Sequence, residues 1–294
     1  MSTLQIKKLD KYPSASSIEY IDGKLYLMGD DATNFLVLDT NLNIIDSIPV
    51  ITNSARRIPK ETKPDLEASA FNNDSNEIFL FGSGSLSPYR NLVWRYNIQT
   101  RLKDSVSLEN LYTQVKNLGI EQVNIEGACF IGGKLILVNR GNKGYPKNHL
   151  IITDDKFWNK DSNFQISIIP FAAQRHSNSF KGISGLCYAK ESDRLIMTVS
   201  TEDTKNSYDD GAIGKSYLWI INNISTKINN KALGDKRVID LEYLDPRFKG
   251  QKIESATVIG ETNEMIHLVL VADNDDGSST VFKMSIQKTT SHAE

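Results

Sequence analysis

With 294 residues, the chain is long enough for one large domain or two domains of average size. Its 34 basic and 36 acidic residues leave a formal net charge of -2, which gives no global field to attract nucleic acid or an anionic membrane. The N-terminus has no apolar core of signal-peptide length, and no run approaches the ~18 apolar residues of a membrane span. We therefore expect a soluble cytoplasmic protein without nucleic-acid or membrane partners.

The first predicted strand lies at residues 4–9, where apolar and polar residues alternate. A group of four strands follows it, at residues 16–21, 24–28, 34–39 and 44–49. Asp22 and Gly23 separate the first two strands of this group and are a strong signal for a hairpin turn. The group is therefore expected to form an antiparallel meander.

Four similar groups of short apolar strands follow along the chain. Their strands are expected at residues 66–71, 77–81, 92–96 and 102–106; at 125–131, 134–138, 149–153 and 164–169; at 183–188, 194–197, 217–221 and 237–241; and at 253–258, 266–270 and 280–286. Aromatic and β-branched residues fill most of these runs, as is typical of strands. The fifth group has only three strands.

Two connections depart from this pattern. Residues 107–119 have apolar residues at helical spacing between Ser107, in N-cap position, and the terminating Gly119, which predicts a short helix. Residues 222–231 are rich in asparagine and are expected to be a polar loop between outer strands of the fourth group.

The groups share a motif near the start of their first strand, seen clearly as Ile125-Glu126-Gly127. We call the aligned residues Ser16, Glu67, Glu126, Ser184 and Glu254 the column residues. They lie 51, 59, 58 and 70 residues apart, which suits four-stranded propeller blades with long loops. The sequence therefore predicts one all-β domain, a five-bladed β-propeller with blades at about residues 12–52, 64–106, 123–170, 181–243 and 251–287.

The strand missing from the last blade can come from the other end of the chain. The N-terminal segment, at residues 3–10, has no role in the first blade and can pair with the strand at 280–286. Such pairing closes the ring and removes an exposed sheet edge.

Cys129 and Cys187 are the only cysteines, and they occupy the same position in consecutive repeats. Two such residues define neither a metal-binding spacing nor a disulfide scaffold. Equivalent positions in neighbouring blades point the same way, which does not suit the ~5.5 Å Cα separation of a disulfide. Both are predicted to be reduced core residues.

The first strand of a propeller blade lies nearest the axis, so the column residues are expected around one end of the central channel. Glu67, Glu126 and Glu254 would repel one another there unless a cation, raised pKa values or basic neighbours offset their charge. Ca²⁺ or Mg²⁺ suits such oxygen ligands, and Ser16 and Ser184 could complete its shell. Alternatively, each glutamate accepts hydrogen bonds from a neighbouring blade, and its recurrence reflects only the geometry of the repeat.

Basic residues are expected at the same end of the channel. The candidates are Arg57, Lys63, Arg140, Arg175 and His176, all in loops that join or enter the inner strands. Arginine in particular binds phosphate or carboxylate groups through its two-pronged guanidinium. These residues predict a site for a small polar or anionic ligand.

No signature of a familiar catalytic site is found in the sequence. It lacks a Gly-Xaa-Ser-Xaa-Gly elbow, a Walker loop, a His-Glu-Xaa-Xaa-His motif and a dinucleotide fingerprint. The sequence therefore identifies no catalytic residue. A pair of channel glutamates could serve as acid and base of a glycosidase, which requires carboxyl groups ~5 to 9.5 Å apart.

The motifs at Leu66-Glu67-Ala68, Ile125-Glu126-Gly127, Ile183-Ser184-Gly185 and Ile253-Glu254-Ser255 resemble those of uncharacterised bacterial β-propeller proteins. More distantly, the chain is similar to the esterase-like phytase propellers. This resemblance implies carboxylates that hold Ca²⁺ ions and a substrate phosphate at the channel mouth. The matching positions are Glu67, Glu126 and Glu254, whereas Ser16 and Ser184 stand where further acidic residues would be expected.

Three functions are compatible with these observations. The first is the binding of a small polar or anionic ligand at the channel mouth, with a divalent cation as a candidate cofactor. The second is hydrolysis of a phosphoester or glycoside by the channel carboxylates, and the third is a scaffold for protein interaction. A monomer is expected in each case.

Overall fold

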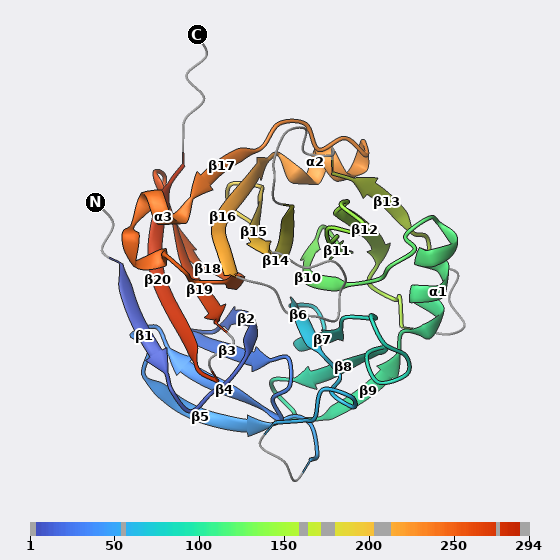
Figure 1. Ribbon diagram of the computed structural model, residues 1–294, viewed down its shortest axis with the longest axis horizontal. Helices are drawn as coiled ribbons and strands as arrows, with labels where there is room; N and C mark the ends of the chain where they lie inside the picture. Colours follow the sequence, from blue (N-terminus) through green and yellow to red (C-terminus); the bar gives the residue numbers. More distant parts are fainter. Residues whose placement is uncertain are drawn as a thin grey trace.

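Five four-stranded antiparallel sheets make up the computed structural model, which describes residues 4–53, 57–158, 164–171, 180–202, 213–274 and 277–288. The sheets stand around a central axis like the blades of a propeller (Figure 1). Their inner strands are β2 (Ala15–Ile21), β6 (Leu66–Asn72), β10 (Ile125–Ile131), β14 (Lys181–Ala189) and β18 (Ile253–Glu261). The predicted five-bladed β-propeller is confirmed.

In the first four blades, the strands follow one another outward from the axis, each paired with the next. Blade 1 continues with β3 (Lys24–Gly29), β4 (Asn34–Asp39) and β5 (Ile44–Pro49), and blade 2 with β7 (Glu77–Gly82), β8 (Leu92–Asn97) and β9 (Lys103–Ser107). Blade 3 continues with β11 (Lys134–Asn139), β12 (His149–Asp154) and β13 (Ser167–Pro170), and blade 4 with β15 (Arg194–Glu202), β16 (Ile213–Asn222) and β17 (Arg237–Asp240). Each blade is therefore the predicted meander.

Blade 5 combines strands from both ends of the chain. It contains β18, β19 (Met265–Asp273), β20 (Ser279–Gln287) and the N-terminal strand β1 (Gln5–Leu9) as its outermost member. β1 runs antiparallel to β20, with Gln5 opposite Lys283 and Leu9 opposite Ser279. The ring is therefore closed by the N-terminal strand, as the incomplete fifth repeat predicted.

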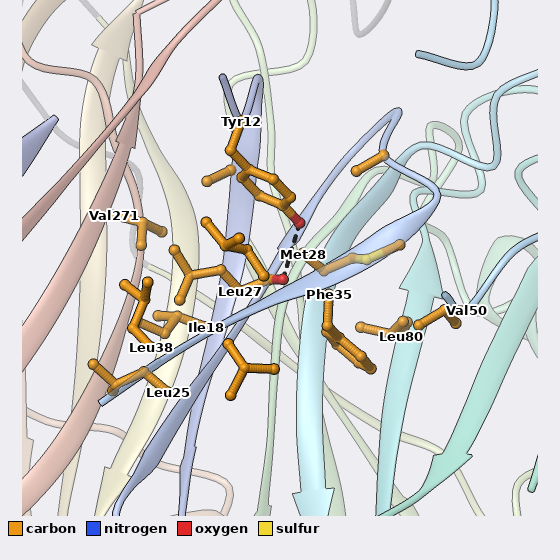
Figure 2. Packing of buried hydrophobic residues seen from close by; sticks show 14 of the residues in the cluster. Tyr12, Ile18, Leu25, Leu27, Met28, Phe35, Leu38, Val50, Leu80 and Val271 are labelled. Carbon is orange, nitrogen blue, oxygen red and sulfur yellow. Dashed lines mark hydrogen bonds between the residues drawn. The ribbon is translucent and has the colours of Figure 1, made fainter. Parts of the chain in front are cut away.

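The core lies between neighbouring blades, where alternate strand residues point into each inter-blade space. Figure 2 shows the part around blade 1, where Leu27 and Phe35 pack in one cluster with Leu80 of blade 2 and Val271 of blade 5. Tyr12 reaches into this cluster, and its hydroxyl donates to the Leu27 carbonyl at 2.9 Å. Apolar packing thus fixes the blades against one another and positions the inner strands.

Helix α1 (Glu109–Asn117) lies in the predicted connection between blades 2 and 3, and Gly119 follows it with φ of 101°. The predicted N-cap is wrong by one residue. Leu108 occupies the cap and gives no side-chain hydrogen bond, while the Ser107 hydroxyl accepts from the amide of Glu109. Leu108 is buried, so packing at this position outweighs the capping preference of Ser107.

The predicted polar loop at residues 222–231 instead contains helix α2 (Ile224–Asn229). Ile224 and Ile228, one helical turn apart, are buried in the cluster between blades 3 and 4. The asparagine-rich composition concealed this pair. Blade 4 also carries α3 (Leu241–Leu244) and the 3₁₀ turn η1 (Pro246–Phe248). No helix in the described part of the chain is long and apolar enough to cross a membrane.

Candidate functional site

All five column residues lie at β-bulges near the start of the inner strands. In β10, Ile125 pairs with Asn139 and Gly127 with Val138, so Glu126 is the extra residue between two consecutive pairs. The same register shift occurs at Ser16, Glu67, Ser184 and Glu254. A bulge redirects the side chain of the extra residue. We call this end of the ring axis the mouth, and the opposite end of the inner strands the far end.

The residues that flank each bulge explain the repeated sequence motif. Every residue before a column residue is 0% exposed: Ala15, Leu66, Ile125, Ile183 and Ile253. Every residue after it is small: Ser17, Ala68, Gly127, Gly185 and Ser255. A Cβ added to Gly127 would lie only 2.7 Å from the Leu186 nitrogen, so the neighbouring inner strand leaves no room there for a side chain.

The two serines of the column connect neighbouring blades. The Ser16 hydroxyl donates to the Leu66 carbonyl at 2.6 Å, and the Ser184 hydroxyl donates to the Ile253 carbonyl at 2.7 Å. Each acceptor immediately precedes the column residue of an adjacent blade. At these two positions the column residue connects one blade to the next, a role that the sequence analysis assigned, as an alternative, to the glutamates.

Two of the column glutamates have a basic partner. The Glu126 carboxylate accepts from the Asn124 amide at 2.7 Å and from the Arg140 guanidinium at 3.4 Å. Glu254 lies 3.1 Å from the Lys252 ammonium, while its second oxygen, Oε2, is buried and accepts no hydrogen bond. Side chains of the mouth thus contact both of these glutamates.

The third glutamate, Glu67, belongs to a carboxylate cluster. One oxygen from each of Asp30, Asp65 and Glu67 lies within 4.8 Å of the other two. This is the one such group of three possible metal ligands found among the described residues. Of the three predicted metal ligands, only Glu67 belongs to this group. Its two acidic neighbours, Asp30 and Asp65, are not column residues.

Lys63 and Arg90 provide positive charge within this cluster. The Lys63 ammonium contacts Asp30 and lies 2.8 Å from Asp65. The Arg90 guanidinium, whose side chain is only 2% exposed, lies 2.7 Å from the other oxygen of Asp65, which also accepts from Ser83 at 2.5 Å. Both oxygens of Asp65 are thus engaged by other side chains.

The two remaining carboxylates of the cluster have altered pKa values. Burial raises the pKa of Asp30 to about 6, with Lys63 acting against the shift and Asp31 and Asp65 adding to it. Burial, followed by the charges of Asp65, Asp30 and Glu126, raises the pKa of Glu67 well above its usual value, and Lys63 opposes this only in part. The negative charge of the mouth is therefore least compensated at Glu67.

The other predicted basic residues have different positions. Arg57, 53% exposed, donates to Asp31 at 2.7 Å and to Ser14 at 3.1 Å. Arg140 is buried and donates to Ser200 as well as to Glu126. Arg175 and His176 lie outside the described residues.

Sequence reasoning did not select Asp30, Asp65, Arg90 or Lys252 as site residues. Asp65 and Lys252 each stand two residues before a column residue, so their position in the repeat could have identified them. Asp30 directly follows the second strand of blade 1, at the same end of the ring. Arg90, in the loop between β7 and β8, has no comparable signal in the sequence.

The fold and this site define the chain as a five-bladed β-propeller with a ring of bulged residues and paired charges at its mouth. Residues 11–286 match the family of unknown function DUF6929, and the chain belongs to that family. No curated protein matches the chain.

Solved structures similar to this chain have little sequence in common with it. Glutaminyl cyclase from Myxococcus xanthus has a TM-score of 0.51 at 10% identity, with 98% of each chain covered. A member of the duf4221 family from Bacteroides vulgatus has a TM-score of 0.47 at 13% identity, with 98% of this chain and 97% of that chain covered. Virginiamycin B lyase from Staphylococcus aureus has a TM-score of 0.45 at 9% identity, with coverage of 96% and 99%. At such identities the likeness concerns the fold alone.

Proposed function

We propose that the channel mouth binds a small polar ligand and that a positive charge, either on the ligand or on a divalent cation bound with it, is recognised by Glu67. The observation that carries this proposal is the carboxyl group of Glu67, which Lys63 compensates only in part. Within the described part of the chain it receives no hydrogen bond, although it is close to Asp30 and Asp65. A cation at this position would relieve the repulsion that raises its pKa.

The local balance of charge supports a ligand of this kind. Among the described residues that pair directly here, four carboxylates and three basic side chains leave a formal charge of one negative unit; they are Asp30, Asp31, Asp65 and Glu67 with Arg57, Lys63 and Arg90. Glu126 and Glu254 each have a basic partner of their own. The surplus therefore lies at Glu67 rather than around the whole ring.

Anion binding is supported less directly. The basic groups that sequence reasoning assigned to an anion, Lys63 and Arg140 among them, are engaged with carboxylates. An anionic ligand would have to compete with these carboxylates or reach the mouth together with a cation. Arg57, half exposed beside Asp31, is the predicted basic residue best placed for such a ligand.

A divalent cation would be held by Asp30, Asp65 and Glu67, whose oxygen atoms suit Ca²⁺ or Mg²⁺. Lys63 contacts two of these carboxylates and would have to withdraw as the cation entered. The ion would supply a positive charge to which an anionic or hydroxylated ligand could bind. The donor set thus fits a hard cation, with Lys63 as its competitor.

Thermal unfolding and calorimetric titration test the proposal. We expect CaCl₂ or MgCl₂, or a small polyamine such as spermidine, to stabilise the parent protein, by about 2.7 kcal/mol at a free concentration of 100 times the dissociation constant. Glu67→Gln should abolish this effect, because the amide has no charge for the cation to neutralise. Asp104→Asn is the matched control, since Asp104 pairs with Arg95 on the outer strand of blade 2.

Inorganic phosphate distinguishes the two sources of positive charge. If a metal ion mediates binding, phosphate should stabilise the parent protein only when Ca²⁺ or Mg²⁺ is present. The proposal fails if none of the cations affects the parent, or if Glu67→Gln responds to them as the parent does. A crystal soaked with calcium and phosphate would then be expected to lack density beside Glu67.

A hydrolase is the second candidate, and one observation favours it. Glu67 has a raised pKa, as a general acid requires, and its charge interacts with that of Glu126 in the neighbouring blade. Phosphoester hydrolysis of the phytase type, which the resemblance implies, or glycoside hydrolysis would use this pair. A panel of phosphoesters and glycosides should be assayed with added Ca²⁺ or Mg²⁺. Turnover that is lost in Glu67→Gln and in Glu126→Gln would support a hydrolase. Binding without turnover would exclude the tested compounds as substrates.

A further inference from the structure

A cavity of about 310 Å³ lies inside the ring, toward the far end of the inner strands, and all five of these strands line it. Each blade contributes the residues that stand three and four positions after its column residue. The first set is Glu19, Ala70, Cys129, Cys187 and Thr257, and the second set is Tyr20, Phe71, Phe130, Tyr188 and Val258. The repeat therefore builds this cavity as it builds the mouth.

The exposure of the lining shows where the cavity opens. All members of the first set except Glu19 are buried, whereas every member of the second set is partly exposed. Lys190, which directly follows β14, also lines the cavity and is exposed. Exposure thus increases along the inner strands toward the far end, and a ligand can enter from there.

Glu19 is the one carboxyl group among the described residues that line the cavity. Its oxygen Oε1 accepts from the Ser69 hydroxyl at 2.8 Å, and within the described part of the chain Glu19 has no ion pair. Burial raises the pKa of Glu19 to about 7, and the bond from Ser69 opposes this only in part. An ammonium group placed beside Glu19 would favour the charged form of its carboxyl group.

Lys190 is the one basic residue of the same lining. No ion pair joins it to a carboxylate among the residues that the structure describes. Lys190 stands six residues after Ser184, whereas Glu19 stands three residues after Ser16, a difference of about 10 Å along a strand. The cavity thus presents a carboxyl group in its wall and an ammonium group at its rim.

We propose that this cavity binds a small zwitterion, a molecule in which a short carbon chain joins an ammonium group to a carboxylate. The ammonium group of the ligand donates to the Glu19 carboxylate, and the carboxylate of the ligand accepts from the Lys190 ammonium group. The aromatic residues of the second set surround the carbon chain, and their rings also attract the ligand's positive charge. Such a ligand compensates both charged groups of the lining and brings no net charge into the cavity.

A ligand with a single charge fits this lining less well. A cation would meet the like charge of Lys190 at the rim, and an anion would meet the carboxylate of Glu19 in the wall. Cys129 and Cys187 add no charge, because burial raises the pKa of each thiol above its usual value. They form part of the apolar wall, as buried free cysteines commonly do.

This proposal does not depend on the proposed function of the mouth. Glu19 lies three residues beyond Ser16 on β2, which is about 10 Å along the strand. The mouth site rests on Glu67 and its acidic neighbours, none of which lines the cavity. The two sites can therefore be tested separately in the same protein.

Calorimetric titration at pH 8 with 6-aminohexanoate provides the main test. Hexylamine and hexanoate each carry one of its two charges, and glycine carries both charges much closer together. We expect 6-aminohexanoate to bind at one equivalent and more tightly than the other three compounds, because it alone can reach Glu19 and Lys190 together.

Variants of the two charged residues should weaken this binding unequally. Glu19→Gln should lower the affinity by roughly thirtyfold or more, the effect of removing one partner of a desolvated charge pair. Lys190→Gln should lower it by roughly twofold to fivefold, because Lys190 is exposed. The matched controls are Glu121→Gln and Lys249→Gln, at exposed positions outside the lining, and both should bind as the parent does.

The mouth variant Glu67→Gln separates this proposal from the preceding one. It should bind 6-aminohexanoate as the parent does while losing the response to Ca²⁺, and Glu19→Gln should show the reverse. The proposal is wrong if the parent does not bind 6-aminohexanoate or if Glu19→Gln binds it equally well. It is also wrong if hexylamine, hexanoate or glycine binds the parent as tightly as 6-aminohexanoate does.

Discussion

Glu126 and Glu19 are both partly or fully buried carboxyl groups on inner strands, yet their hydrogen-bond donors differ in charge. Glu126, at the mouth, has Asn124 and Arg140 as hydrogen-bond donors. Glu19, toward the far end, has the neutral Ser69 hydroxyl, and burial raises its pKa to about 7. Glu126 is thus compensated by a basic side chain, whereas the raised pKa of Glu19 favours its protonated form.

This difference follows from the loops. At the mouth, loops enter the inner strands and leave the second strands, and those around blades 2 and 3 bring Lys63, Arg90 and Arg140 to the column. At the far end the inner strand of blade 1 passes into β3 through the two-residue turn Asp22-Gly23. Functional diversity in this ring is therefore expected at the mouth, and the far end depends on the inner strands alone.

The largest effect on stability should come from breaking the charge pair at the mouth. Arg140→Met should lower the free energy of unfolding by about 3 kcal/mol, because it removes the Arg140 guanidinium from the buried Glu126 carboxylate. Urea unfolding would measure this loss. Adding Glu126→Gln should recover part of it; a double variant as unstable as the simple sum of the two would show that the residues are not coupled.

Removing the carboxyl group of Glu19, toward the far end, should raise the free energy of unfolding at neutral and higher pH. Because folding raises the pKa of Glu19 from 4.5 to about 7, the stability it contributes is full below pH 4.5, declines between pH 4.5 and 7, and is absent above. Glu19→Gln should therefore be more stable than the parent by about 3 kcal/mol at pH 8 and equal to it near pH 4. Parallel urea titrations across this range would check the sign, and identical pH profiles for the two proteins would contradict it.

The serine positions of the column should show a smaller effect without any effect on ligands. Ser184→Ala should cost about 1 kcal/mol, since it removes the hydrogen bond to the Ile253 carbonyl. Its response to Ca²⁺ or spermidine should equal that of the parent, unlike that of Glu67→Gln. Ser105→Ala, on an exposed part of β9, is the matched control and should leave the melting temperature unchanged.

The smallest effect is expected from the exposed pair at the edge of the mouth. Arg57→Gln should cost about 0.5 kcal/mol and become neutral at high salt, because Arg57 is half exposed. A loss as large as that of Arg140→Met, measured under the same conditions, would mean that exposure does not decide the strength of the pairs in the mouth.

The five-bladed fold could be predicted from the sequence because the repeated motif reflects the packing of adjacent residues in each inner strand. Ile125 is fully buried, Glu126 lies at the bulge, and Gly127 meets the backbone of the next inner strand, so three adjacent residues record the packing around the axis. The missing outer strand was also predictable, because the fifth repeat lacked one of its four strands. Both features depend on residues that are close together in the sequence.

The partners of the column could not be predicted in the same way. Arg90 reaches Asp65 from a loop 25 residues further along the chain, and nothing periodic marks it. Such contacts depend on how loops and strands meet in space, which the spacing of residues within one repeat does not record.

The closure of blade 5 has a mechanical consequence. Gln5 at the start of β1 lies opposite Lys283 in the middle of β20, and the two strands are antiparallel, so the first residue of β1 and the last residues of β20 lie toward the same edge of the blade. A force applied to the two ends would load the hydrogen bonds between these strands one after another, beginning at Gln5 and ending at Leu9. Such a force would break the β1–β20 hydrogen bonds one at a time and not all together, so β1 would separate from blade 5 at low force. Without force, the same hydrogen bonds hold the last blade together.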